Sequence, residues 1–442
     1  MNAKLPSASG ASGEADGGVA IALREICGRV SAVCPTVDRD PAAALEVVLR
    51  AEDELRAFAA GGWCVGDMQE FRLAARALAD VYGSLFVQAG HAVSRVSAAA
   101  SCAEALKWDA LEGMAPDPVL WERLGSLLRP DLDAGLSLIA GDLESVARHY
   151  LRAVSYQAAA FDQLDRKVLV PACHLLEMCL PFLAMSRRPP SAPHYTAFPE
   201  HGAVPQRSLS VPREPAFHLS TAAAEEWLQG LASRLAEVTS PIALDRGVAG
   251  EYLAVARHLL WRWSDDPPVR RSKRHPMAGR VIVVRGLEAC RRLIAGDVDV
   301  SASRWSVFDA NRGSMGIVSE RCSAVEIPSI GELVGVRFED ADVVHVGLVR
   351  RLRVDPGGVR FGLQLVSRAP RTATVEDGRA PAQVLLCDPL ARGEAVRLIA
   401  SSANVLGDDS LFLKAASAVY KLHPLEAPWV GLGFAMRVYQ LI

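Results

Sequence analysis

The sequence predicts an α+β protein of several domains. We expect an N-terminal α-helical bundle or irregular α-solenoid, then a six-stranded antiparallel β-barrel and a further small C-terminal β-module. Two observations lead to this fold class. Alanine and leucine dominate residues 19–185, where apolar residues recur at helical spacing. After Pro276 the apolar period changes to two, which is typical of strands.

Composition restricts the class of protein further. The chain has 442 residues, of which 50% are hydrophobic and 22% are charged. This is ordinary globular material, long enough for two or three hydrophobic cores. The formal net charge of −3 gives no global reason to expect DNA, RNA or an anionic membrane as a partner. Any electrostatic function must therefore be local.

Neither the N-terminus nor any apolar run predicts a membrane segment. Residues 1–18 are rich in alanine, serine and glycine and are expected to form a disordered tail. The most apolar run, 174–185, contains Glu177 and Pro181 and is too short to cross a bilayer. The nine cysteines are scattered without a Cys-x-x-Cys pair, which favours free thiols in a reducing compartment. We therefore expect a cytoplasmic protein.

Helix boundaries are marked by capping residues in the α-helical domain, 19–185. Asp40 is a predicted N-cap with Pro41 at the first helical position. A second helix is expected over 67–88, and Asp142 is a candidate cap for a third. Such helices pair to bury their apolar faces. No fixed repeat period is visible.

A proline-rich segment, 186–217, interrupts the helical pattern and predicts a linker or an extended strap on the surface. Helical spacing returns over 218–266. Ser220 begins one predicted helix there, and 247–264 forms another. The pair is expected to be a helical hairpin that leads into the β region.

Six short β-branched segments between glycine, aspartate and proline turns predict the first β-barrel, over 267–378. Asp355-Pro356-Gly357-Gly358 is a strong hairpin signal between the last two strands. We expect no helix between these strands. The predicted strands are 281–284, 303–308, 315–318, 332–338, 343–352 and 359–366. Residues 379–442 also have a strand pattern and are expected to form the second module.

A candidate anion-binding site combines two parts of the first β region. The basic cluster Arg270-Arg271-Ser272-Lys273-Arg274 precedes the first strand. Residues 311–316, Asn-Arg-Gly-Ser-Met-Gly, lie at the turn between the next two strands. Cationic side chains and open backbone at a glycine-containing turn are suited to an anion.

The order of these parts resembles the PilZ domain, a bacterial receptor module for cyclic di-GMP. The resemblance covers roughly residues 268–378. It rests on Arg-x-x-x-Arg (Arg270, Arg274), a strand, Asn-x-x-x-x-Gly (Asn311, Gly316), and a later Val-Gly-Leu-Val-Arg-Arg segment. The family's second motif is Asp/Asn-x-Ser-x-x-Gly. Its serine position is occupied here by Gly313, and Ser314 follows one residue late.

The resemblance implies cyclic di-GMP as a ligand and assigns roles to particular residues. Arginine pairs with phosphate or with a guanine edge and stacks on the base. Arg270 and Arg274 would bind the ligand in this way, assisted by Arg271 or Lys273. Asn311 would hydrogen-bond a guanine edge, and Gly313 and Gly316 would let the ligand approach the backbone. Ser314 completes the set of candidate residues.

A structural interpretation of the same residues remains open. The basic cluster follows Asp265-Asp266-Pro267-Pro268 and has the composition of a solvated linker, and Asn311-Arg312-Gly313 forms a good turn without any ligand. The missing serine hydroxyl would weaken binding several-fold, since one hydrogen bond contributes about 1 kcal/mol.

Two functions are therefore weighed. The first is a cyclic di-GMP receptor whose barrel binds the nucleotide and whose helical region binds an unidentified protein. The alternative is a PilZ-like interaction scaffold that binds no nucleotide, in a motility, secretion or exopolysaccharide system. A third alternative is an enzyme of unrecognised type in the α-helical half. We find no enzymatic motif, however, and expect neither catalysis nor a metal site. The sequence decides neither the protein partner nor whether the chain forms homo-oligomers.

Overall fold

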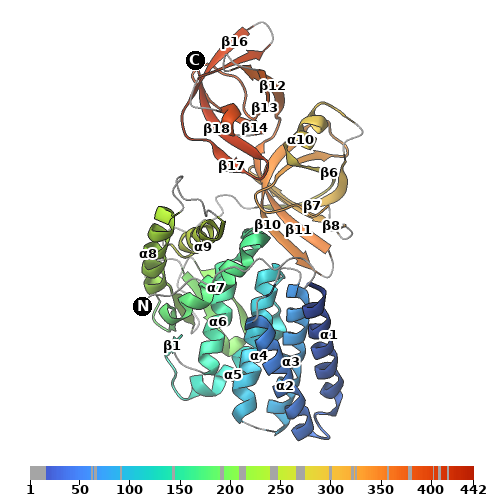
Figure 1. Cartoon of the computed structure of the whole chain (residues 1–442), viewed down its shortest axis with the longest axis vertical. Coiled ribbons are helices and arrows are strands. Elements are labelled where there is room, and N and C mark those ends of the chain that lie inside the picture. Colours follow the sequence, from blue (N-terminus) through green and yellow to red (C-terminus); the bar gives the residue numbers. More distant parts are fainter. Residues whose placement is uncertain are drawn as a thin grey trace. The chain divides into compact units, whose positions relative to one another are not determined.

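The computed structural model of the chain divides into two compact units, Met1–Val269 and Arg270–Ile442, which are described separately (Figure 1). The structure describes residues 16–60, 63, 67–89, 92–141, 145–189, 194–208, 216–238, 247–264, 274–297, 301–319, 323, 326–355, 358–376, 381–401, 403–406, 410–415 and 418–442. In these ranges no helix has both the length and the apolar composition needed to cross a membrane.

The first unit is mainly helical, which confirms the predicted fold class. Its helices are α1 (Asp16–Val33), α2 (Pro41–Ala60), α3 (Met68–Ala89), α4 (Ala92–Glu112), α5 (Pro118–Asp133), α6 (Val146–Ala159), α7 (Leu169–Cys179), α8 (Ala222–Val238) and α9 (Gly247–Trp263). All nine contribute to one hydrophobic core, which includes the buried side chains of Trp108, Trp121 and Tyr150. Helices α8 and α9 pack together, as a hairpin requires.

Capping explains where several helices begin. The Asp40 carboxylate accepts a hydrogen bond from the backbone N–H of Ala43 at 3.0 Å, so the predicted cap of α2 is confirmed. Helix α6 is capped by Ser145, whose hydroxyl accepts from the N–H of Arg148 at 3.2 Å. Asp142, the residue predicted for that cap, lies outside the described residues.

A small sheet accompanies the helices and corrects the expected linker at 186–217. Its strands are β1 (Leu138–Ala140), β2 (Ala184–Ser186), β3 (His194–Phe198), β4 (Ala203–Ser208) and β5 (Phe217–Ser220), in the order β1-β2-β5-β3-β4. Ala197 and Phe217 are buried in the core of the unit. The described part of the proline-rich segment is therefore structured. Pro199 lies between β3 and β4, and Pro205 is tolerated within β4 because β4 is at the edge of the sheet.

The second unit begins with the predicted six-stranded barrel. Strands β6 (His275–Arg285), β7 (Ser303–Asn311), β8 (Ser314–Ser319), β9 (Leu333–Phe338), β10 (Val344–Asp355) and β11 (Gly358–Ser367) close in the order β10-β11-β8-β7-β6-β9. Their inward residues, among them Val283, Ile317 and Phe361, form a separate core. All six strand pairs are antiparallel.

One helix in this unit was not predicted. Residues Gly286–Ile294 form α10 directly after β6, although the sequence suggested no helix between the strands. Leu287, Cys290 and Leu293 recur every three residues and are buried. This face covers the side chain of Val284 and helps to form a second core of the unit.

The C-terminal module is a second ring of strands. β12 (Arg371–Glu376), β13 (Pro381–Leu386), β14 (Ala395–Ala400), β15 (Leu411–Ala415), β16 (Ala418–Pro424) and β18 (Phe434–Leu441) pair in a closed cycle, and β17 (Trp429–Gly431) adds to β18. Strand β12 pairs with β13 and β15, so it belongs to this ring although the sequence placed residues up to 378 with the first barrel.

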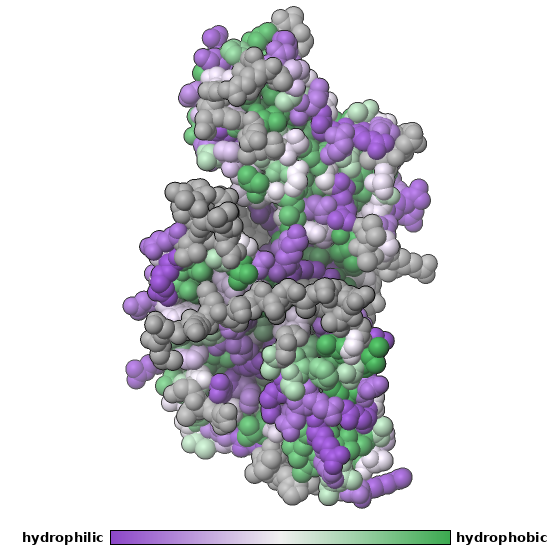
Figure 2. Space-filling model, viewed as in Figure 1, coloured by the Kyte–Doolittle hydropathy of each residue, from purple (hydrophilic) through white to green (hydrophobic). Residues whose placement is uncertain are grey.

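Figure 2 shows hydrophilic and hydrophobic side chains interspersed over the visible surface of the helices. Among the apolar residues of these helices, Ile21, Leu49 and Leu73 are 40–55% exposed. Scattered exposure of this kind is normal for a water-facing surface and marks no site by itself.

Candidate functional site

Five of the seven predicted site residues are described by the structure, and they lie at the start of β6 and along the β7–β8 hairpin. These are Arg274, Asn311, Gly313, Ser314 and Gly316. Arg270 and Arg271, together with the helper Lys273, lie outside the described residues. The structure therefore shows how one arginine of the basic cluster meets the turn.

The turn is held by Asn311, the last residue of β7. Its Oδ1 accepts hydrogen bonds from the backbone N–H of Gly313 and from the hydroxyl of Ser314, both at 2.9 Å. An asparagine that bonds the backbone two residues ahead forms an Asx turn, which fixes a tight hairpin. Part of the acceptor capacity of Asn311 is thus used by the chain itself.

Arg274 joins the basic cluster to this hairpin. Its Nε donates to the hydroxyl of Ser314 at 3.0 Å, and its Nη1 donates to the carboxylate of Asp309 at 2.9 Å. The side chain of Arg274 is 14% exposed and that of Asp309 is 22% exposed. The two predicted parts of the site therefore converge, and Ser314 supplies a hydroxyl to the cluster despite its shifted position in the sequence.

The two glycines of the motif differ in whether the fold requires a glycine at that position. β7 carries a bulge between Val307 and Asp309, opposite β8. A Cβ on Gly316 would lie 2.2 Å from Oδ1 of Asp309 and 2.5 Å from Cζ of Phe308, so only glycine leaves room for these side chains. The ring of Phe308 lies against Gly316, and Phe308 is still 42% exposed.

Gly313 meets no such constraint. A Cβ built there has no atom within 4 Å, and Gly313 is not among the glycines with positive φ. A residue that keeps the N–H and adds a Cβ can therefore occupy this position without backbone strain or a clash at Cβ. The serine that the family motif places here is absent for a reason other than local sterics.

Three further arginines flank this cluster, and sequence reasoning did not select them as site residues. Arg353 on β10 lies directly opposite Arg360 on β11, and Arg351 lies opposite Gly362. Core residues alternate with them along both strands, so these side chains are on the outer face of the barrel. Like charges directly opposite each other on a sheet repel.

The outer face also brings Arg274 next to Arg351. Gly362 pairs with Gly316 on β8, which places β11 beside the motif. A Cβ on Gly362 would lie 3.5 Å from Cβ of Arg351 and 3.8 Å from Nη2 of Arg274. We call Arg274, Arg351, Arg353 and Arg360 the arginine face. Its four cations, of which Arg274 is paired with Asp309, suit an anion with more than one negative charge.

The missed residues had a weak signal in the sequence. Arg351, Arg353 and Arg360 alternate with apolar residues around the predicted hairpin at 355–358, as outward residues of two paired strands do. Only the register shows which of them face one another, since a shift of one residue would move them to the opposite face.

Comparison with models of protein families gives no match for this chain, and comparison with curated proteins gives none either. Among solved structures, a similar chain is the PlzA protein of Borreliella burgdorferi in complex with c-di-GMP. The match has 10% sequence identity and covers 38% of this chain and 87% of that chain, with a TM-score of 0.15. A likeness at this level assigns the present chain to no family, and the functional argument depends on the geometry of its own site.

Proposed function

We propose that the chain is a bacterial cyclic di-GMP receptor that binds the nucleotide on the arginine face of a PilZ-like barrel. The observation that carries the proposal is the convergence of Arg274 with Ser314 and Asp309 beside the β7–β8 turn. This arrangement joins the two sequence motifs from which the resemblance to the PilZ family was inferred.

The chemistry of the face matches the ligand. Cyclic di-GMP presents two phosphates and two guanine bases, and guanidinium groups pair with both kinds of acceptor. Arg353 and Arg360, which lie opposite each other on β10 and β11, offer two further guanidinium groups to the phosphates. The exposed ring of Phe308 offers a surface on which a base can stack. The carboxylate of Asp309 is an acceptor for the N–H groups of a guanine edge.

The basic cluster before β6 extends the proposal. Arg270, Arg271 and Lys273 are close in sequence to Arg274 and would add cations to the same ligand. In this proposal ligand binding by the cluster is transmitted to a protein partner of the helical region. The chain acts in the cytoplasm and has no catalytic role.

A second candidate function is supported by one observation. Arg274 already has partners within the chain, a carboxylate and a hydroxyl, so its charge is satisfied without a ligand. This favours a PilZ-like scaffold that binds proteins but no nucleotide. A nucleotide-independent partner recovered in a pull-down, together with no binding of cyclic di-GMP, is the outcome expected of this scaffold.

Calorimetric titration of the full chain with cyclic di-GMP tests the receptor. We expect micromolar binding that weakens at least tenfold in Arg274→Ala, because a charge-assisted hydrogen bond contributes about 1.5–3 kcal/mol. Arg292→Ala is the matched control, since Arg292 is on α10 and its partner is Asp297. Absence of heat with the wild-type protein at millimolar ligand would reject the receptor. Equal affinity in Arg274→Ala would reject the site.

A further inference from the structure

The two barrels of the second unit share a hydrophobic core. Leu348 on β10 and Phe434 on β18 are both buried in it. A hydrogen bond of 2.6 Å also joins the barrels, from the hydroxyl of Ser367 on β11 to the carbonyl of Cys387. Because a close-packed core allows little movement, side chains of the second barrel beside this core have a defined position relative to β10 and β11.

The indole of Trp429, on β17, lies against an arginine of the first barrel. The Cζ atom of Arg350, on β10, lies over this ring at 5.8 Å from its centre, within the range of a cation–π contact. The Nε of Arg350 donates to Oε1 of Gln364 on β11 at 2.7 Å. The ring at one face and the amide at one edge fix the plane of this guanidinium. Trp429 is 39% exposed, and Arg350 is also exposed.

A bulge in β10 brings Arg350 to the edge of the arginine face. The register between β10 and β11 shifts just before Arg351, which leaves Arg350 without a paired residue on β11. Gln364, the partner of its Nε, lies directly opposite Ser314 on β8, and Ser314 accepts from Arg274. Neighbouring strands are about 4.8 Å apart, so a ligand of two nucleotides can contact Arg274 and Arg350 together.

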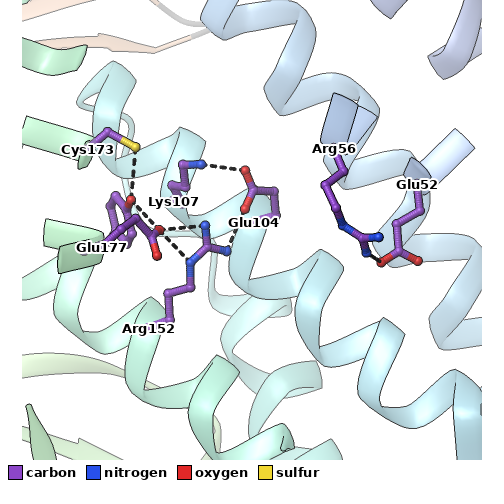
Figure 3. Close-up of polar contacts among 8 residues, drawn as sticks. Glu52, Arg56, Glu104, Lys107, Arg152, Cys173 and Glu177 are labelled. Carbon is purple, nitrogen blue, oxygen red and sulfur yellow. Dashed lines mark hydrogen bonds and ion pairs between the residues drawn. The ribbon is translucent and has the colours of Figure 1, made fainter. Parts of the chain in front are cut away.

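Arg350 differs from Arg274 and from Arg152 in its counter-charge. Arg274 bonds a carboxylate, and Arg152 of the helical unit bonds two, Glu104 and Glu177 (Figure 3). Among the residues that the structure describes, Arg350 has no carboxylate partner, and partial burial lowers its pKa. Its second guanidinium face and its Nη1 and Nη2 donors are therefore available to a ligand.

From these observations we propose that Arg350 is a further ligand-binding residue, whose guanidinium stacks on one guanine base of cyclic di-GMP while Trp429 holds the opposite face. This inference rests on the function proposed above. A planar guanidinium stacks on aromatic rings, so base, guanidinium and indole form three layers. Trp429 is a positioning residue that acts through Arg350. The second barrel is thereby a part of the binding site.

Titration of full-length Arg350→Lys with cyclic di-GMP tests the stack, because lysine keeps the charge but lacks the planar group. We expect binding at least tenfold weaker than in the wild type. Arg304→Lys is the matched control, since Arg304 on β7 is 87% exposed and pairs with Glu339. Binding that is weakened in Arg274→Ala but unchanged in Arg350→Lys would overturn this inference alone. Absence of binding by the wild type would reject the receptor and this inference together.

Variants of Trp429 test the part played by the second barrel. Trp429→Ala should weaken cyclic di-GMP at least threefold, and Trp429→Phe, which keeps a ring, should bind within twofold of the wild type. Phe412→Ala is the control, because it removes a ring of similar exposure from β15 of the same barrel. In the Arg350→Lys background Trp429→Ala should have no further effect. Equal losses in Trp429→Ala and Phe412→Ala, or additive losses with Arg350→Lys, would contradict positioning through Arg350.

Discussion

At the scale of single residues, the β7–β8 hairpin separates glycines that the fold needs from one that it does not. Gly316 makes room for Phe308 and Asp309 at the bulge of β7. Gly313 has open space where a side chain would begin and an ordinary backbone conformation. Gly313 is therefore the position at which the proposed ligand-binding motif can be altered without altering the barrel.

Gly313→Ser should strengthen binding of cyclic di-GMP, given the receptor proposed above. The substitution restores the serine of the Asn-x-Ser-x-x-Gly motif, and one added hydrogen bond of about 1 kcal/mol corresponds to about a fivefold gain in affinity. Gly313→Ala is the control, because it adds the Cβ without the hydroxyl. Titration calorimetry of both variants measures the effect. Equal affinities in the serine and alanine variants would show that this hydroxyl does not reach the ligand.

The residues of the site differ in how far the sequence could predict them. The Asx turn of Asn311 depends on contacts within three residues, so the local sequence was sufficient. Arg274 was predicted from the motif, but its partner Asp309 was not. The pairing of Arg353 with Arg360 depends on a register that a change of one residue would reverse. Such cross-strand contacts require the structure.

At the scale of elements, Arg152 links three helices of the first unit. It lies on α6, and its guanidinium bonds Glu104 on α4 and Glu177 on α7. Burial acts to raise the pKa of the Glu104 carboxyl, but Lys107 and Arg152 together hold it below the usual range. The hydroxyl of Tyr156 completes the set with a hydrogen bond to Glu177 at 2.8 Å. The helices are therefore held in register by charges as well as by apolar packing.

Arg152→Met should destabilise the helical unit by about 3 kcal/mol, because removing one member of a buried ion cluster leaves the other charges uncompensated. Arg50→Met is the matched control. Arg50 pairs with Glu46 on the surface of α2, where the side chains are 72% and 66% exposed, and such a pair contributes about 0.5 kcal/mol. Urea unfolding followed by the helical circular dichroism signal measures both. Equal losses in the two variants would contradict the structural role of the cluster.

The elements that the sequence failed to predict have identifiable physical causes. Helix α10 has Leu287, Cys290 and Leu293 at helical spacing, but it is only nine residues long and follows directly on a strand. Strands β3 and β4 are short, Pro199 separates them and Pro205 lies within β4, so local composition predicted a linker. In each case tertiary packing, rather than local preference, determines the element.

At the scale of the whole molecule, the helical unit contains buried groups whose pKa values are shifted in opposite directions. The helical unit contains two imidazoles, His149 and His258, whose pKa values burial lowers to about 4. It also contains Asp109, whose pKa burial raises to about 6 and whose Oδ2 is buried without a hydrogen-bond partner in the described structure. These groups give the helical unit a pH dependence with contributions of opposite sign.

The sign of each contribution follows from the direction of its shift. A histidine with a lowered pKa in the folded state binds its proton more readily when unfolded, so its contribution to stability is lost as the pH falls from about 6.5 to 4. An aspartate with a raised pKa contributes stability at low pH that is lost as the pH rises from about 4 to 6. Asp109 therefore opposes the two histidines over the same interval.

His258→Gln should reduce the acid sensitivity of the helical unit. The Nε2–H of His258 donates to the carbonyl of Ala159 at 2.7 Å, and a glutamine amide can donate to the same oxygen without taking up a proton. Between pH 6.5 and 4.5 the variant should lose about 2 kcal/mol less unfolding free energy than the wild type. Asp109→Asn should act oppositely, since removing Asp109 leaves the histidine contributions unopposed and makes the curve steeper. Urea titrations across this range distinguish the two variants. If the unfolding free energies of the wild type and of His258→Gln fall in parallel as the pH is lowered, the imidazole of His258 takes up its proton in the folded protein at no cost. That outcome would contradict the prediction.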